Sequence, residues 1–307
     1  MSVETSGPAL PRAERIAPAV PLAGFRDYLA LTRPGVVLLA VLTGGPVLLL
    51  DRGPRPGILT PLAILAVIVL IGCACSVLNA WIERDRDSLM ARTRNRPLPA
   101  GRITPAEALG FGLAVAAAGV VTLAARGGAL AALIGALTLA WYLGIYTVWA
   151  KPRTAHNTVL GAVAGAAPPL IAAAGMDGRI GGFGWALFAI VFAWQPPHVW
   201  AIALFRGAEY EAAGFRMMPA VVGARGARAR MLAWALALVA ASLIPWRMRV
   251  LGPVYAATGL VAGTWFVATI VRAIRARDAR ADRRVLGASI LYLLALFLEM
   301  LAELALR

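Results

Sequence analysis

The residues that could do chemistry are concentrated in three short segments. They are residues 79–99, 146–161 and 194–219. In the first segment Asn79, Glu83 and Asp87 are spaced four apart, so on a helix they lie within about 80° of one another. An amide and two carboxylates are hard oxygen ligands, which Mg²⁺ accepts together with water and substrate phosphates. This helix face therefore predicts a magnesium–diphosphate site.

Arginines follow this face directly. Arg92 and Arg96 belong to a basic run whose guanidinium groups suit bidentate contacts with phosphate. The alternative interpretation is a solvated, salt-bridged helix end with ordinary basic residues. Polar residues beside an apolar helix are costly where lipid reaches them, which favours a functional site.

The second segment carries the only lysine of the chain, Lys151, close to Arg153 and five residues after Tyr146. Basic groups beside hydroxyl and amide groups suit an anionic leaving group. A short loop with ordinary basic residues would explain the same pattern.

The third segment contains a Gln-Pro-Pro-His run that ends at His198, inside a long apolar stretch. Proline frees backbone groups that must be satisfied within the protein or at a cavity. Arg206 and Tyr210 follow at a spacing of four, and Glu209 belongs to a second acidic cluster. The alternative for His198 is a packed histidine in an apolar helix.

The elements that must position these segments are membrane helices. The chain has 307 residues, of which 60% are hydrophobic, and a mean hydropathy of +0.75, more apolar surface than a soluble domain can hide. We expect an all-α polytopic membrane protein with nine transmembrane helices around a central cavity that opens at the cytosolic face. The predicted runs are approximately 34–50, 61–82, 105–123, 129–149, 157–174, 183–205, 229–246, 252–272 and 285–305. Residues 1–24 are predicted to be a disordered cytosolic tail and residues 25–307 a single transmembrane domain.

The distribution of charge predicts the orientation. With the N-terminus in the cytosol, 23 of the 30 Lys and Arg residues fall on the cytosolic side, as the positive-inside rule requires. The three polar segments then share that side, as in a bacterial-type inner membrane protein. Because topology and anionic lipid account for the net charge of +15, no nucleic-acid partner is expected.

Two acidic clusters on one membrane face, with basic residues between them, suit the ionisation of an allylic diphosphate. Metal and basic groups stabilise the departing diphosphate, and an apolar chamber protects the allylic cation from water. An isoprenoid tail would lie between the helices.

At these residues the chain resembles the UbiA-type intramembrane prenyltransferase superfamily. Asn79, Glu83 and Asp87 match its first motif, and the sequence RTRNRPLP follows. Within the superfamily, YTVWAKPRT, WQPPHVWAIAL and EYEAAGFRMMP resemble the protoheme IX farnesyltransferases, or haem O synthases. Glu83 departs from the superfamily, which favours Asp there, and Ala208 and Glu209 replace a pair of aspartates.

The resemblance implies transfer of the farnesyl group of farnesyl diphosphate to a vinyl group of haem B, with water, to give haem O and diphosphate for terminal oxidases. It implies Mg²⁺ as the cofactor and leaves open a contact with haem A synthase or oxidase assembly factors. The implied magnesium ligands are Asn79, Glu83, Asp87 and Glu209. The implied catalytic residues are Asn79, Asp87, Tyr146 and Lys151, and the implied substrate-binding residues are Arg33, Arg92, Arg96, Arg153, His198, Arg206 and Tyr210.

Two other functions fit parts of the sequence. A sister enzyme could prenylate an aromatic or quinone precursor, although the WQPPH run argues against it. A transporter of an anionic substrate should place its binding groups near the bilayer midplane, whereas the ionisable residues here gather at helix ends.

Overall fold

The computed structural model describes residues 23–50 and 57–306, and every regular element in this part of the chain is helical. The predicted disordered tail, residues 1–24, lies almost wholly outside the described residues. The elements are α1 (Phe25–Thr32), α2 (Pro34–Leu49), α3 (Leu59–Leu89), α4 (Pro105–Ala140), η1 (Trp141–Ala150), α5 (Lys151–Arg153), α6 (Asn157–Gly165), α7 (Pro168–Asp177), α8 (Gly182–Phe205), α9 (Gly207–Ala212), α10 (Met218–Ser242), α11 (Ile244–Arg247), α12 (Pro253–Ala276) and α13 (Ala279–Ala305).

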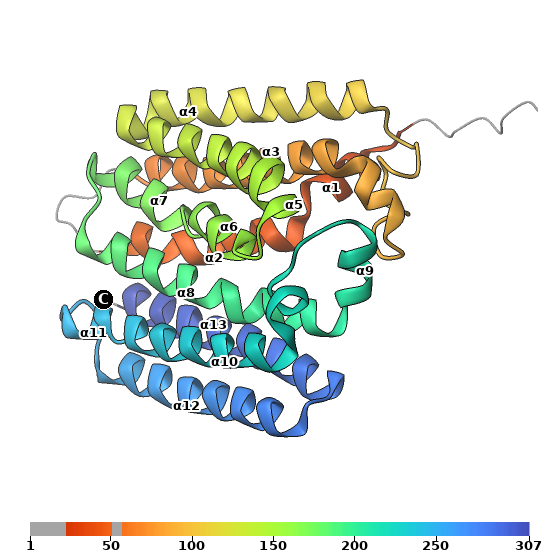
Figure 1. The fold of residues 1–307 in the computed structure, drawn as a ribbon. Coiled ribbons are helices and arrows are strands. Elements are labelled where there is room, and N and C mark those ends of the chain that lie inside the picture. The colour runs from red at the N-terminus through yellow and green to blue at the C-terminus, as the bar shows by residue number, and fades with distance from the viewer. Residues whose placement is uncertain (1–22, 51–56, 307) are drawn as a thin grey trace, which may run out of the picture.

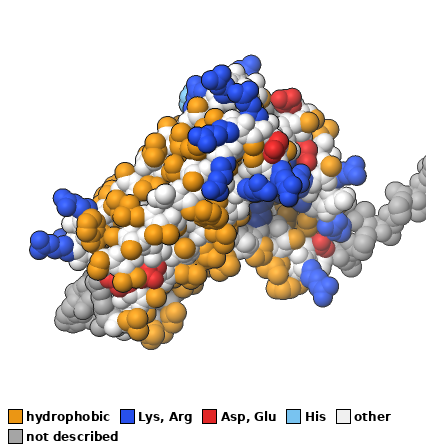
Figure 2. Space-filling view, turned by 90° about the horizontal axis from the view of Figure 1, so that it is seen from below, with side chains coloured by type: hydrophobic (Ala, Val, Ile, Leu, Met, Phe, Trp, Pro, Cys, Tyr) orange, Lys and Arg blue, Asp and Glu red, His pale blue; other side chains and the backbone are white. Residues whose placement is uncertain are grey.

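The long helices run side by side along one common direction (Figure 1). The short helices α5 and α9 lie at the same end of this bundle, whereas α11 and the C-terminus lie at the other end. Apolar side chains cover much of the face seen in Figure 2, and Lys and Arg side chains gather toward one end of it. An apolar belt with an excess of basic residues at one end fits a chain that crosses a membrane.

The all-α membrane fold is confirmed, but the predicted count of nine spans is not. Within the described residues, seven helical segments are long and apolar enough to cross a membrane, or eight if the pair α1 and α2, bent by 49°, counts as one span. The difference lies in Pro105–Arg153, a continuous segment of 49 residues that the sequence divides into two runs.

This segment folds back on itself at Gly128. The residue has φ 79° and ψ 174°, outside the helical region and in a conformation that glycine alone adopts readily. On either side of the break the chain packs against itself, since a Cβ at Gly135 would lie 2.6 Å from Leu123 Cδ1. Figure 1 shows the two halves of α4 running in opposite directions.

Helix α3 is longer than its apolar run and so carries the polar residues beyond it. The run was predicted to end near residue 82, but the helix continues to Leu89. One face of the polar extension is buried, because Glu83 and Asp87 are only 3% and 1% exposed. The stable extension keeps one helical face continuous from the bundle interior to its polar end.

Candidate active site

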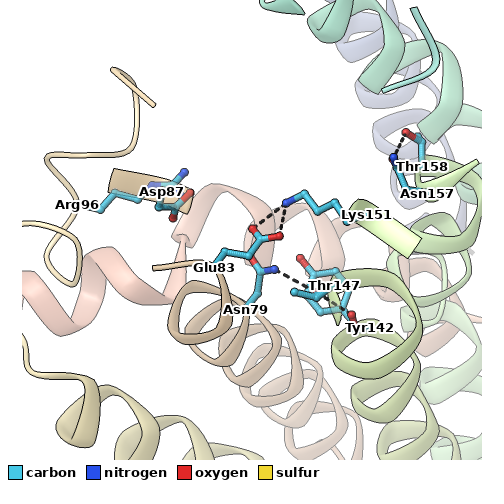
Figure 3. Close-up of polar contacts among 9 residues, drawn as sticks. All are labelled: Asn79, Glu83, Asp87, Arg96, Tyr142, Thr147, Lys151, Asn157 and Thr158. Atoms are coloured by element: carbon cyan, nitrogen blue, oxygen red, sulfur yellow. Dashed lines mark hydrogen bonds and ion pairs between the residues drawn. The ribbon is translucent and has the colours of Figure 1, made fainter. Parts of the chain in front are cut away.

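The predicted face of α3 is intact and buried. Asn79, Glu83 and Asp87 come from successive turns of the helix, and each has a partner from another part of the chain (Figure 3). The Asn79 amide donates to Thr147 Oγ1 at 3.1 Å. The other side-chain atom, Asn79 Oδ1, is buried and accepts no hydrogen bond from any residue that the structure describes.

Both carboxylates of this face are paired with cations. Lys151 Nζ lies 2.6 Å from Glu83 Oε1 and donates to Oε2 at 2.7 Å. Arg96 Nη1 donates to Asp87 Oδ2 at 2.8 Å. Because Glu83 and Lys151 are far apart in sequence, this contact shows that the first and second polar segments meet in space.

Arg96 lies among other positive charges. Burial lowers the pKa of its guanidinium, and the positive charges of Arg33 and Arg92 add to this effect, whereas Asp87 opposes it. Arginine nevertheless stays protonated in proteins. Three guanidinium groups within electrostatic reach of one another form a locus that would favour an anion.

A π-helix, which the sequence did not predict, positions the second segment. Residues Trp141–Ala150 form η1, in which Lys151 N donates to Tyr146 O, five residues back. The Thr147 hydroxyl likewise donates to Tyr142 O at 2.8 Å. In a π-helix, backbone hydrogen bonds join residues five apart. The wider turn therefore brings Lys151 close to Tyr146, and Lys151 Nζ lies 5.7 Å from the centroid of the Tyr146 ring.

The Tyr146 ring lies against helix α6 at a glycine. A Cβ built on Gly161 would come within 2.7 Å of Tyr146 Cδ2, so no side chain fits there without displacing the ring. Lys151, the ion-pair partner of Glu83, also lies beside this ring. Tyr146 is therefore next to the pair that joins the first two polar segments.

The sequence reasoning missed Phe215, which joins the third segment to the other two. Phe215 is 2% exposed. Two basic side chains contact its ring: Lys151 Nζ lies 4.5 Å from the ring centroid and Arg86 Cζ lies 5.3 Å from it. The backbone beside it is fixed by Asn157, whose amide donates to Arg216 O at 2.8 Å. An aromatic residue between two basic side chains holds them without neutralising their charge.

An apolar cavity begins where the polar face ends. It reaches α3 at Cys75 and Ser76, one turn before Asn79. Tyr142, four residues before Tyr146, lies in its wall. Most other lining residues are apolar and come from α2, α3, α7 and α8, including Leu39, Ile68, Ile71, Ile171, Val191 and Trp194.

The other predicted substrate-binding residues lie in different settings. Arg33 has φ 52°, uncommon outside glycine, at the bend between α1 and α2. Arg153 is turned back onto its own chain, where it donates to Val148 O and Trp149 O. His198 lines a separate hollow on α8, and Tyr210 packs edge-on against Phe215 at 6.4 Å.

The second acidic cluster is separate from the first. Glu209 pairs with Arg206 at 3.5 Å across the start of α9. Within residues 23–50 and 57–306, no three His, Cys, Asp or Glu side chains form a group that could hold a metal ion. The structure thus does not gather Glu83, Asp87 and Glu209 into one such group.

The α3 face nevertheless fits a hard cation. Buried polar atoms are rarely left without partners, and Asn79 Oδ1 is such an atom on the face that carries Glu83 and Asp87. An amide oxygen and two carboxylates are suitable ligands for Mg²⁺, with phosphate oxygens and water completing its shell. The lysine and arginine partners of the carboxylates could then turn to the phosphates.

A helical membrane fold with a polar site at the mouth of an apolar cavity is the architecture expected of an intramembrane prenyltransferase, and the UbiA prenyltransferase family model matches residues 37–298. The chain therefore belongs to the UbiA prenyltransferase family.

Among its relatives are proteins named Protoheme IX farnesyltransferase. One, from Methylobacterium radiotolerans, is 41% identical over 305 residues, which cover 97% of this chain and 95% of the relative. Another, from Symbiobacterium thermophilum, is 41% identical over 286 residues, which cover 91% of this chain and 94% of the relative. The resemblance to this branch is thus confirmed over nearly the whole length of the chain.

Solved structures share the fold. A structure of digeranylgeranylglyceryl phosphate synthase superimposes with a TM-score of 0.77 at 15% identity, covering 92% of this chain and 99% of the other. A UbiA homologue from Archaeoglobus fulgidus bound to DMAPP and Mg²⁺ superimposes with a TM-score of 0.67 at 16% identity, covering 92% and 100%.

Proposed function

We propose that this protein transfers the farnesyl group of farnesyl diphosphate to a vinyl group of haem B, with addition of water, to give haem O and diphosphate. The observation that carries the proposal is the continuity of the α3 face. Its turns carry Ser76 in the wall of an apolar cavity and then Asn79, Glu83 and Asp87 among cations. A molecule with an apolar tail and a diphosphate head matches this sequence of environments.

The diphosphate would lie among the cations at the polar end. Lys151 and Arg96 donate to its oxygens in place of Glu83 and Asp87, and Arg33 and Arg92 add positive charge. Asn79, Glu83 and Asp87 would hold Mg²⁺, which would supply positive charge to stabilise the leaving diphosphate. Glu209 is proposed as a further ligand from the opposite side of the diphosphate, with Arg206 as an additional phosphate contact and Tyr210 lining the substrate.

The remaining residues would protect and orient the allylic carbon. When its bond to oxygen breaks, the positive charge on this carbon faces the Tyr146 ring, whose negative π-face stabilises a cation. The apolar cavity holds the farnesyl chain and excludes water. The allylic carbon then bonds to the terminal vinyl carbon of haem B, and the adjacent carbon takes up water with loss of a proton.

The location follows the distribution of charge. We propose that the polar end of the bundle faces the cytosol of a cell whose inner membrane holds the protein, because most Lys and Arg residues belong to segments at that end. Haem A synthase or an oxidase assembly factor is a proposed neighbour, since haem O is poorly soluble in water.

The test is a product assay with the purified protein. Farnesyl diphosphate, Mg²⁺ and haem B are supplied together, and the haem is analysed by mass spectrometry. We expect a haem heavier by one farnesyl group and one hydroxyl group, formed together with an equal amount of diphosphate. Release of diphosphate with unchanged haem would contradict the proposal, and prenylation of an aromatic acid by the same purified protein would favour a sister enzyme.

A further inference from the structure

The hydrogen bonds around His198 define which of its ring nitrogens carries the proton. Nδ1 lies 2.8 Å from Ser289 Oγ, and the Ser289 hydroxyl donates to Leu286 O at 2.7 Å. Because a serine hydroxyl has one proton, Ser289 must accept from His198. His198 therefore carries a proton on Nδ1, and no other described residue donates to its Nε2.

The ring is also held in one orientation. Trp194 stacks on it with a centroid distance of 4.3 Å and an interplanar angle of 28°. Trp194 Nε1 in turn donates to the backbone oxygen of Ser289 at 2.7 Å. An imidazole fixed through Nδ1–H, with Nε2 left bare, is the usual state of a histidine that ligates a metal through Nε2.

His198 lines an apolar hollow between α2, α8 and α13. Its other lining residues are Gly35, Val36, Leu39, Leu42, Trp194, Ile290, Leu293 and Leu294. Three of these, Val36, Ile290 and Leu294, are at least 40% exposed on a helical surface that faces lipid in a membrane. Val36, Leu39 and Trp194 also line the central cavity, so the two spaces share a wall.

A basic group lies at the polar end of this hollow. Phe205 is seven residues after His198 on α8, and Arg283 is seven residues before Ile290 on α13. Seven residues are about two turns, or roughly 10 Å, and return to the same helix face. Arg283 Cζ lies 5.3 Å from the Phe205 ring centroid, so α8 and α13 are in contact about two turns beyond His198 and Ile290.

We propose that this hollow is the binding site of the haem acceptor, with His198 Nε2 as an axial ligand of the haem iron and Arg283 as the partner of a propionate. The inference rests on the proposed function. A porphyrin is apolar over its faces, offers a metal at its centre and carries carboxylates at one edge, which matches the order of groups along the groove. Anchored there, its vinyl edge would reach the farnesyl chain through the shared wall.

The test measures haem ligation spectroscopically and uses the full chain without a polyhistidine tag. Purified protein in detergent is titrated with ferric haem B, and the Soret band and the electron paramagnetic resonance spectrum are recorded. The chain has two histidines, so His156→Ala, in an exposed loop, is the matched control for His198→Ala. We expect the wild-type protein and His156→Ala to give the spectrum of imidazole-ligated haem, and His198→Ala to lose it.

Three further variants guard against an effect of misfolding. Free imidazole should restore the spectrum to His198→Gly. Ser289→Ala should weaken haem binding about tenfold while keeping the ligated spectrum, the usual effect of removing a partner of a metal ligand. Arg283→Ala should raise the Kd about tenfold, equivalent to about 1.4 kcal/mol, without altering the spectrum.

The outcomes separate the inference from the proposed function. A His198→Ala protein that makes haem O and retains the wild-type spectrum would overturn the inference alone. A wild-type protein that ligates haem through His198 but forms no farnesylated haem would support the inference and contradict the proposed function. A wild-type protein that binds no haem would overturn both.

Discussion

Lys151 Nζ lies within 2.7 Å of both carboxylate oxygens of Glu83, and this pair joins α3 to the segment that follows the π-helix. The pair is nearly excluded from solvent, with side-chain exposures of 14% for Lys151 and 3% for Glu83. Buried ion pairs contribute little net stability, but removing one partner leaves a costly unpaired charge. Under the proposed function, the pair would keep the proposed metal ligand Glu83 and the proposed phosphate ligand Lys151 adjacent before substrate binds.

The first prediction concerns this pair. Lys151→Met should destabilise the protein by about 3–5 kcal/mol, because Glu83 is left buried and unpaired. The double variant Lys151→Met/Glu83→Gln should recover most of this loss, since neither charge remains. Thermal unfolding in detergent measures both effects, and additive losses in the double variant would contradict a direct coupling between the two residues.

A different substitution at the same lysine tests its contact with substrate. Lys151→Ala should raise the KM for farnesyl diphosphate at saturating Mg²⁺, because an ammonium that contacts phosphate is lost. An unchanged KM would show that Lys151 serves the fold or the topology but not the substrate.

The α3 face could be predicted because its geometry is local. A spacing of four residues places Asn79, Glu83 and Asp87 on one side of any helix, and only the continuation of the helix to Leu89 had to be assumed. The apolar runs were likewise visible in composition, although Pro105–Arg153 is counted as one segment and not as two. The residues of this motif are also the ones on which the family resemblance rested.

The parts of the site that join distant segments could not be predicted in this way. No local pattern indicates that η1 is a π-helix, yet its wider turn decides that Lys151 lies beside Tyr146. Phe215 was overlooked because an aromatic residue in a connection has no periodicity to mark it. Its position one residue before Arg216, within the motif EYEAAGFRMMP, was the available signal.

The second prediction separates the catalytic face from the neighbouring acidic residue. Asp87→Asn should lower kcat about 100-fold or more, because a charge that acts on the transition state is removed. Asp85→Asn is the matched control, since the Asp85 side chain is 87% exposed and lies off the face. Steady-state rates of haem O formation measure both, and equal losses would contradict the assignment of Asp87.

The third prediction concerns the metal. Chelation with EDTA should abolish transfer, and Mg²⁺ should restore it. Asn79→Ala should raise the Mg²⁺ concentration for half-maximal rate about tenfold, because Oδ1, which has no protein partner, is lost. Thr147→Val removes only the hydroxyl that accepts from the amide and should change this concentration much less, so equal shifts would argue for a structural role of Asn79.

The last prediction concerns the contact between Tyr146 and α6. Gly161→Ala places a methyl group 2.7 Å from a Tyr146 ring carbon, so the ring must move away from its present position. If this ring faces the allylic cation, kcat should fall about tenfold, whereas the affinity for farnesyl diphosphate, set mainly by the cations, should change little. Gly144→Ala, on the π-helix that carries Tyr146, is the control, because a Cβ at Gly144 meets nothing within 4 Å. Single-turnover rates and binding measured with a non-reactive farnesyl diphosphate analogue separate the two quantities. A Gly161→Ala protein that reacts at the wild-type rate would remove Tyr146 from the reaction, because its displaced ring could no longer lie where the cation forms.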